Sequence, residues 1–397
     1  MLRQNKPERK KGLGFFRCAI HDFSPLGNTG CEKAVGILER FSCKTVIYSG
    51  AGAIAALGEF KAKRVFLVTD PFFMKNGTAQ KVAEAAGAEQ VAYFDGVKPD
   101  PTVELAAEGT AKLKAFSPDL VVALGGGSAM DCAKAMAYFA RAECPLAAVP
   151  TTSGSGSEVT DFAIVTHKNV KHPLVDERLR PDMAILDSDL LESMPKGLVA
   201  DTGVDVLAHA LEACVATKAG TMTDLLAREA FSSAYGALPA SFAGRQDARM
   251  RVHRAAAMAG LAFTQAGLGL CHAMAHALGG MFHVPHGRLN AILLPGVIDI
   301  NAQAAGHKYA DMARAAGISG SADTVAVRNL KNGIIRLRKE LGLPGTLAQA
   351  GVDPREVWHR TGQIVEATLA DPCCATNPMG VEDFLVRRLL EAVTGRV

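Results

Sequence analysis

The chain has 397 residues, of which 49% are hydrophobic and 21% are charged, and its formal net charge is +3. This length is too great for one ordinary hydrophobic core, so we expect two domains. The small net charge and the aromatic content of 6% exclude the extended basic and base-stacking surfaces of nucleic-acid-binding proteins.

Cysteine usage and hydropathy favour a cytoplasmic protein. The nine cysteines are odd in number and form no Cys-x-x-Cys pair, so a disulfide framework is not expected. No uninterrupted apolar run is long enough to span a bilayer, and the nearest candidate, residues 255–271, is interrupted by Thr264 and Gln265. The basic N-terminus lacks the apolar core of a secretory signal.

Residues 1–43 are predicted to be an N-terminal extension. They begin polar and basic, and glycine and proline recur in the part that follows. A short amphipathic helix over residues 32–41 would place its apolar side chains on one side. The alternative is a loosely held tail without a function of its own.

Residues 44–195 alternate strand and helix patterns. Buried strands are predicted at residues 64–70, 91–94, 120–124, 146–150 and 183–187. Helices are predicted at residues 78–86, 102–115 and 128–141. Because strands and helices alternate, we predict an α/β domain with a parallel, Rossmann-like sheet that carries helices on both faces.

Residues 196–397 show helical patterns without strand signals. Helices are predicted at residues 197–217, 223–237, 249–279 and from residue 321 to the end. We therefore predict an all-helical second domain. A ligand site is expected in the cleft between the two domains.

A glycine-rich loop follows the third predicted strand. Gly125-Gly126-Gly127-Ser128 leads from that strand into a helix, and the unpaired first N–H groups of the helix can bind a pyrophosphate. Ser128 and Asp131 also fit a capping box, so an ordinary strand-to-helix turn is the alternative. The pattern is not the Gly-x-Gly-x-x-Gly fingerprint.

Two further features support a nucleotide site. The loop 150–158 follows another strand at the same expected edge of the sheet, and its hydroxyl residues and glycines can donate to phosphate and ribose. Asp70 ends the first predicted strand, where a carboxylate can accept hydrogen bonds from ribose hydroxyls and repel a 2′-phosphate, which favours NAD over NADP. A helix cap is the alternative for Asp70.

Four histidines and one aspartate have the spacing of metal ligands. Asp205 and His209 lie one helical turn apart, His272 and His276 repeat that spacing, and His286 follows in a Pro-His-Gly segment that we predict to be a loop. An i, i+4 pair places two side chains on one helix face. Imidazole and carboxylate together suit Zn²⁺, Fe²⁺, Mn²⁺ or Co²⁺.

Spacing alone leaves the ligand set open. Asp201 lies one turn before Asp205, so either carboxylate could bind. Spacing also does not decide which of His272, His276 and His283 does not bind the metal.

These motifs together resemble the iron-dependent (group III) alcohol dehydrogenase family, from roughly Val46 to the C-terminus. The segments that carry the resemblance are, in chain order, GGGSAMD, PTTSGSGSEVT, KHPL, PDMAILD, DVLAHALEA, AGLGLCHAMAHALGG, PHGRLNAILLP and the pair Asn377-Pro378. The nearest likeness is to the propanol and ethanol dehydrogenases of bacterial microcompartments. The resemblance implies the two-domain fold that the family shares with dehydroquinate synthases.

The resemblance implies a role for each candidate site residue. Its metal ligands fall on Asp205, His209, His272 and His286. His276 matches a histidine that faces the reacting group, and we predict it to be catalytic.

The cofactor residues are implied in the same way. The phosphate loop falls on Gly126, Gly127 and Ser128, with Asp131 closing the motif. A second set completes the predicted NAD site, and its members are Thr151 and Thr152 near the nicotinamide, Lys171 at the ribose and Asp70 at the position associated with NAD.

The function implied is reversible hydride transfer between NAD(H) and a short-chain primary alcohol or aldehyde, propanol or ethanol being the favoured alcohols. Fe²⁺ is the implied metal and Zn²⁺ the alternative. Related alternatives are a polyol or lactaldehyde dehydrogenase. A dehydroquinate synthase-like lyase is disfavoured because only Arg288 offers a cation near the histidines, and a non-catalytic assembly component is disfavoured because the ligand set is intact.

The resemblance also suggests partners. We expect a homodimer, in the cytoplasm or inside a bacterial microcompartment. Residues 1–43 are a candidate docking segment for a shell protein or another encapsulated enzyme, because a short amphipathic helix can bind through its apolar face.

Overall fold

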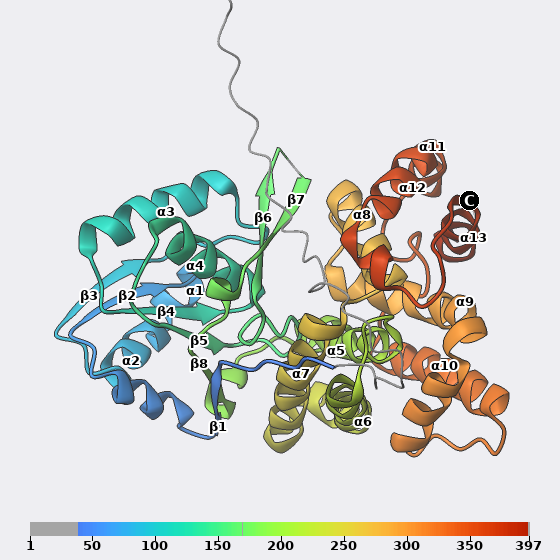
Figure 1. The fold of residues 1–397 in the computed structure, drawn as a ribbon, viewed down its shortest axis with the longest axis horizontal. Helices are drawn as coiled ribbons and strands as arrows, with labels where there is room; N and C mark the ends of the chain where they lie inside the picture. The colour runs from blue at the N-terminus through green and yellow to red at the C-terminus, as the bar shows by residue number, and fades with distance from the viewer. Residues whose placement is uncertain (1–38, 169, 396–397) are drawn as a thin grey trace, which may run out of the picture. The chain divides into compact units, whose positions relative to one another are not determined.

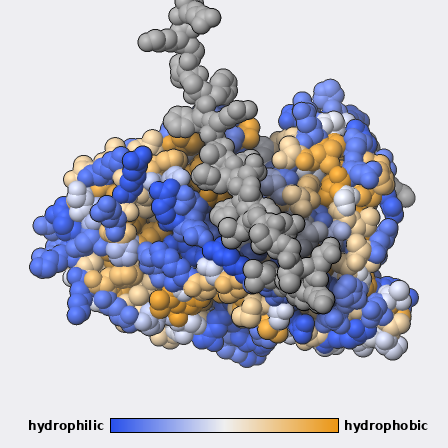
Figure 2. Space-filling model, viewed as in Figure 1, coloured by the Kyte–Doolittle hydropathy of each residue, from blue (hydrophilic) through white to orange (hydrophobic). Residues whose placement is uncertain are grey.

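The computed structural model describes residues 39–168 and 170–395. The docking helix proposed for residues 32–41 lies mostly outside this part of the chain. Within it, none of the helices is long and apolar enough to cross a membrane. On the face drawn in Figure 2, hydrophilic residues are interspersed with groups of apolar ones over the described elements.

A six-stranded parallel sheet forms the first half of the fold (Figure 1). Its strands are β1 (Val46–Gly50), β2 (Arg64–Val68), β3 (Gln90–Phe94), β4 (Leu120–Gly125), β5 (Leu146–Pro150) and β8 (Met183–Asp187). Their order in the sheet is β1-β8-β5-β4-β2-β3. Every residue of β4, β5 and β8 is buried, as expected of central parallel strands covered on both faces.

Helices cover both faces of this sheet. One apolar cluster joins Leu120, Val122 and Leu124 of β4 to α1 (Pro71–Lys75), α2 (Thr78–Ala85) and the 3₁₀ helix η1 (Ala53–Phe60). A second cluster joins Val121 and Ala123 to α3 (Val103–Phe116) and α4 (Gly127–Ala140). The predicted α/β fold with a parallel sheet is therefore confirmed.

A small antiparallel hairpin was not predicted. It consists of β6 (Phe162–His167) and β7 (Val170–Val175). It stands outside the main sheet and packs through Val165 against Ala106 of α3 and Ala135 of α4. Two 3₁₀ helices, η2 (Glu177–Leu179) and η3 (Ser188–Leu191), flank β8.

The second half of the fold is helical. Its elements are α5 (Lys196–Val215), α6 (Thr221–Phe242), α7 (Gln246–Ala266), α8 (Leu270–Phe282), α9 (His286–Ala315), α10 (Asp323–Glu340), α11 (Pro354–His359), α12 (Thr361–Leu369), η4 (Pro372–Thr376) and α13 (Asp383–Thr394). They share one large apolar core.

Two sequence predictions for this half were wrong. The single helix expected over residues 249–279 is divided into α7 and α8. Gly267 breaks it with φ of 85°, and a Cβ at this position would lie 2.4 Å from Thr376 Oγ1, so the chain turns where another segment packs closely. His286 is not a loop residue but the first residue of α9, whose N-cap is Pro285.

Helix α7 packs against the loop that follows β5. A Cβ built on Gly260 of α7 would lie 2.8 Å from the carbonyl oxygen of Gly156, so the two backbones approach as closely as glycine allows. The buried Oγ of Ser153 and Nδ1 of His253 are 3.0 Å apart. The loop at the edge of the sheet is thus held directly on the helical half.

Candidate metal centre and cofactor loop

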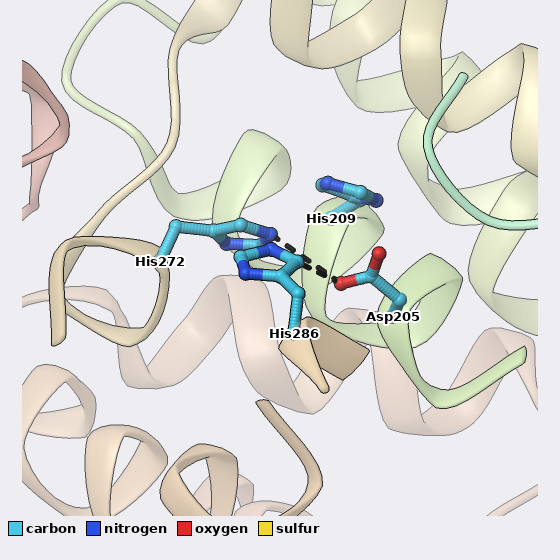
Figure 3. Close-up of side chains that lie close together, drawn as sticks. All are labelled: Asp205, His209, His272 and His286. Atoms are coloured by element: carbon cyan, nitrogen blue, oxygen red, sulfur yellow. Dashed lines mark ion pairs between the residues drawn. The ribbon is translucent and has the colours of Figure 1, made fainter. Parts of the chain in front are cut away.

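The four predicted metal ligands converge in the helical half (Figure 3). Asp205 and His209 come from α5, His272 from α8 and His286 from the start of α9. One potential ligand atom from each residue lies within 4.8 Å of those of the other three. Asp205 Oδ1 is 3.7 Å from His272 Nε2 and 3.6 Å from His286 Nε2.

Aromatic packing fixes the buried rings. His209 stacks between Phe263, at 4.5 Å between ring centroids, and His272, at 4.4 Å. Asp205, His209 and His272 are each less than a tenth exposed, whereas the side chain of His286 is 32% exposed. His286 therefore marks the side on which the centre is accessible.

Asn290 shows that the potential ligand atoms face one point. Its Nδ2 donates to Asp205 Oδ1 at 2.6 Å and lies 3.3 Å from His272 Nε2 and 3.2 Å from His286 Nε2. One carboxylate oxygen and two ring nitrogens from three helices thus lie around a single atom. A carboxylate and imidazoles arranged in this way match the donor set of a divalent transition metal.

Electrostatics prepare these groups for a cation. Burial opposes ionisation of Asp205, but His209, His286 and His272 outweigh it, so the pKa of this carboxyl lies well below its usual range. Burial lowers the pKa of His209 to about 4 and that of His286 well below its usual value. Burial alone would lower the pKa of His272, but the hydrogen bonds to Asp205 and Glu212 raise it to about 9. The ionised carboxylate and the neutral rings of His209 and His286 are in the state that binds metal, and a cation would displace one proton from His272.

Glu212 orients His272 from behind. Its Oε2 lies 2.6 Å from His272 Nδ1, so the ring proton sits on Nδ1 and Nε2 is left for the centre. The same carboxylate accepts the backbone N–H groups of Gly269 at 3.0 Å and Cys271 at 2.7 Å. Glu212 is 1% exposed. It thus satisfies the first turn of α8 and fixes a candidate ligand with one side chain.

His276 lies beside the metal centre and not in it. Its ring stacks on that of His286 with 5.2 Å between centroids. Its Nδ1 is 2.8 Å from Asp371 Oδ2. Burial alone would raise the pKa of Asp371, but the hydrogen bonds from His276 and from the backbone of Cys373 lower it below its usual value.

Asp201 and His283, the two other candidate ligands from the sequence, lie outside the metal centre. Asp201 accepts two hydrogen bonds from Arg288, at 3.1 and 2.9 Å, and does not join the four-residue cluster. His283 is the C-cap of α8 with φ of 54°. Neither lies in a metal-ligand group formed by the described residues.

The glycine loop has the geometry predicted for a phosphate site, apart from its cap. Gly125 has φ of 144°, and a Cβ there would lie 2.8 Å from Ala129 Cβ, so glycine is required. The N-cap of α4 is Gly126, which makes no side-chain capping bond. The capping box of Ser128 and Asp131, which the sequence offered as the alternative, is therefore not formed, and the first turn of α4 is open to an anion.

The second loop lies against the first. The N–H of Thr151 donates to the carbonyl oxygen of Gly125 at 2.9 Å. A Cβ at Gly126 would lie 3.2 Å from Thr152 Oγ1, and one at Gly127 would lie 3.1 Å from Ser155 Oγ. Small residues thus bring the two loops together at the carboxyl ends of β4 and β5.

Asp131 and Lys134 of α4 hold the second loop by hydrogen bonds. Asp131 Oδ1 accepts a hydrogen bond from Ser157 Oγ at 2.7 Å. Lys134 is 1% exposed and donates to Ser157 Oγ at 3.1 Å and to Thr160 O at 3.0 Å. Burial lowers the pKa of Lys134 to about 8. In this structure Asp131 therefore bonds the loop that carries Thr151 and Thr152.

Asp70 and Lys171, the two remaining candidates for cofactor binding, each bond to another residue of the protein. Asp70 caps α1, and its Oδ1 accepts the N–H of Phe72 at 2.8 Å. Its Oδ2 lies 3.7 Å from where a Cβ of Gly125 would be, so it borders the glycine loop. Lys171 on β7 pairs with Asp100 at 2.7 Å. The cofactor roles of both residues stay predictions.

Comparison with known proteins agrees with this geometry. The family model for iron-containing alcohol dehydrogenase matches residues 44–188, and that for the C-terminal part of the Fe-containing alcohol dehydrogenase family matches residues 199–394. The chain is 40% identical over 370 residues to the 1-propanol dehydrogenase PduQ of Citrobacter freundii, covering 89% of this chain and 99% of that protein. It is 37% identical over 379 residues to the NADPH-dependent butanol dehydrogenase of Clostridium saccharobutylicum, covering 89% and 97%.

Solved structures show the same relationship. The iron-containing alcohol dehydrogenase of Thermococcus thioreducens superposes with a TM-score of 0.84 at 33% identity, over 90% of this chain and 100% of that one. A 1,3-propanediol oxidoreductase gives a TM-score of 0.84 at 32% identity, over 89% and 99%. The chain belongs to the iron-containing alcohol dehydrogenase family. It is therefore an oxidoreductase enzyme, as the sequence predicted.

Proposed function

We propose that this enzyme interconverts short-chain primary alcohols and aldehydes with NAD(H), and that Asp205, His209, His272 and His286 hold its divalent cation. The observation that carries this proposal is the convergence of four potential ligand atoms within 4.8 Å. Fe²⁺ is the proposed metal, because the family is named for it, and Zn²⁺ suits the same donors. A divalent cation supplies Lewis acidity toward an alcohol or aldehyde oxygen, and a nicotinamide supplies or accepts the hydride.

The side chains around the centre would orient substrate and move a proton. Asp371 keeps the ring proton of His276 on Nδ1, which leaves a lone pair on Nε2. We propose that Nε2 accepts the proton of the alcohol and passes it to water. His286 lies on the accessible side of the centre, so a substrate would enter past this ring.

The two loops at the sheet edge would bind the dinucleotide. We propose that the open first turn of α4, with Gly126, Gly127 and Ser128, receives the pyrophosphate. Thr151 and Thr152 would lie toward the nicotinamide, with Asp131 supporting their loop through Ser157. Lys171 would reach the ribose on release from Asp100.

Short alcohols are the proposed substrates because two relatives are named for propanol and butanol. The structure also disfavours the lyase alternative, since Arg288 is bound by Asp201 in a two-bond ion pair. Purified enzyme loaded anaerobically with Fe²⁺ is expected to oxidise NADH with C2 to C4 aldehydes, followed by the loss of NADH absorbance. Absence of turnover with every aldehyde, at full iron occupancy, would contradict the proposal.

Asp70 is proposed to select NAD(H) over NADP(H). The change Asp70→Ser keeps a capping hydroxyl for α1 but removes the carboxylate. A hydrogen bond to a charged group contributes about 1.5–3 kcal/mol, so we expect the KM for NADH to rise roughly tenfold or more while the KM for NADPH falls. Steady-state kinetics with both coenzymes measures this, and an unchanged ratio would remove Asp70 from the selection.

Assembly and location are also proposals. We propose a homodimer in the cytoplasm or inside a bacterial microcompartment, the latter because a similar protein is a PduQ 1-propanol dehydrogenase. Residues 1–43 stay a candidate for docking to a shell protein, and the domain boundaries after residues 43 and 195 stay predictions. Light scattering gives the oligomeric state, and co-purification of full-length and truncated chains with shells tests the docking.

A further inference from the structure

A second cluster of metal-binding side chains lies next to the centre described above. His276 of α8, Asp371 and Cys373 of η4 each offer one potential ligand atom, and these atoms lie within 4.8 Å of one another. All three residues are partly exposed, and the side chains of His276 and Asp371 are 31% and 14% exposed, so an ion could reach the cluster from solvent.

The donor set of this cluster differs from that of the main centre. It combines an imidazole nitrogen, a carboxylate oxygen and a sulfur, whereas the main centre has no thiol among its four members. Sulfur favours thiophilic cations, and three protein ligands plus water complete the tetrahedral shell of Zn²⁺. Zinc bond lengths place such ligand atoms about 3.3–3.6 Å apart, so small shifts would close the cluster around an ion.

The cluster is also held in place before any ion binds. Asp371 caps η4, and its Oδ1 accepts the N–H of Cys373 at 2.9 Å. Its other oxygen, Oδ2, is 2.8 Å from His276 Nδ1. The next thiol along the chain, Cys374, points elsewhere and donates to the carbonyl oxygen of Thr368 at 3.1 Å. Only one of the two adjacent cysteines therefore belongs to the cluster.

We propose that His276, Asp371 and Cys373 form a second, inhibitory site for a thiophilic divalent cation such as Zn²⁺. The ion would bind His276 through Nδ1, one oxygen of Asp371 and the sulfur of Cys373. Binding releases the thiol proton of Cys373 to solvent. It also occupies Nδ1 of His276, so the one proton that a metal-bound imidazole keeps lies on Nε2 and the ring can no longer accept a proton there.

The site itself is independent of the proposed function, whereas the inhibition rests on the proposed role of His276. The first test is therefore spectroscopic and needs no turnover. Metal-free protein is titrated anaerobically with Co²⁺, and the sulfur-to-cobalt charge-transfer absorption is recorded. We expect this band in the wild type and in Cys374→Ala, the matched control, and we expect Cys373→Ser to lack it. Its absence from the wild type, or its persistence in Cys373→Ser, would overturn the site.

The second test measures the effect on the enzyme. Zn²⁺ is added to iron-loaded protein, and NADH oxidation with propanal is followed. Loss of a residue that only supports a ligand costs roughly 10- to 100-fold in metal affinity. Loss of the sulfur ligand in Cys373→Ser should therefore raise the Zn²⁺ concentration for half-inhibition by at least that factor, whereas Cys374→Ala should leave it unchanged. Equal zinc sensitivity of all three proteins, with the cobalt band present, would overturn the inhibitory role.

Discussion

Replacing Asp205 by alanine is expected to remove the bound metal and to lower kcat/KM by about 10³-fold or more. Asp205 is the one carboxylate of the cluster, and Oδ1 lies within 3.7 Å of a nitrogen of both His272 and His286. Lewis-acid stabilisation contributes several kcal/mol to such reactions, and each 1.36 kcal/mol corresponds to about a tenfold change in rate. Metal content by mass spectrometry and steady-state kinetics measure the two effects.

Asp201→Ala is the matched control for this change. Asp201 lies one turn earlier on the same helix and pairs with Arg288 and not with the cluster. We expect it to keep its metal. NADH binding, followed by fluorescence, should be unaffected by Asp205→Ala, because the cofactor loops belong to other elements. A full metal complement in Asp205→Ala would show that this carboxylate is not a ligand.

Replacing Glu212 by glutamine is expected to weaken metal binding about 10- to 100-fold without removing any ligand. Its two oxygens accept hydrogen bonds from N–H groups of Gly269, Cys271 and His272. A glutamine would replace one of these oxygens by an NH₂ group, which cannot accept and would face an N–H donor. Leaving a buried donor unsatisfied costs about 1–3 kcal/mol. We therefore also expect the metal-free protein to unfold at lower denaturant concentration.

Chelator competition measures the metal affinity, and urea unfolding measures the stability. Glu158→Gln serves as the control, since Glu158 is also a buried carboxyl but lies in the loop after β5. A double change of Glu212→Gln with His272→Ala should weaken binding little more than His272→Ala alone, because Glu212 acts through that ring. Full additivity would mean that Glu212 does not position His272.

Local patterns predicted much of the fold. The strands at residues 120–124 and 146–150 are short apolar runs between polar segments, and both are fully buried in the sheet. The break between α7 and α8 was missed because glycine does not by itself end a helix. It depends on Thr376, whose side chain packs against Gly267 from a distant part of the chain. The hairpin of β6 and β7 was missed because it buries few residues.

The metal ligands were easier to predict from the sequence than the residues that hold them in place. Asp205 and His209, and the pair His272 and His276, could be recognised because residues one turn apart lie on one helix face. The choice of His272 over His276 came from the resemblance, and the structure brings Asp205, His209 and His272 together. Glu212 and Asp371 were missed because their histidine partners lie 60 and 95 positions away in the sequence. Asn290 lies one turn after His286, and it was missed because His286 was placed in a loop.

The central claim is that one divalent cation lies at the point where Asp205, His209, His272 and His286 converge, within reach of a bound nicotinamide. Crystals grown anaerobically with Fe²⁺ and NADH, measured on both sides of the iron absorption edge, test it most directly. We expect one strong anomalous peak about 2.0–2.2 Å from the oxygen and nitrogen ligands, with the nicotinamide ring beside it. A peak elsewhere, or these side chains without a metal at full iron loading, would contradict the account.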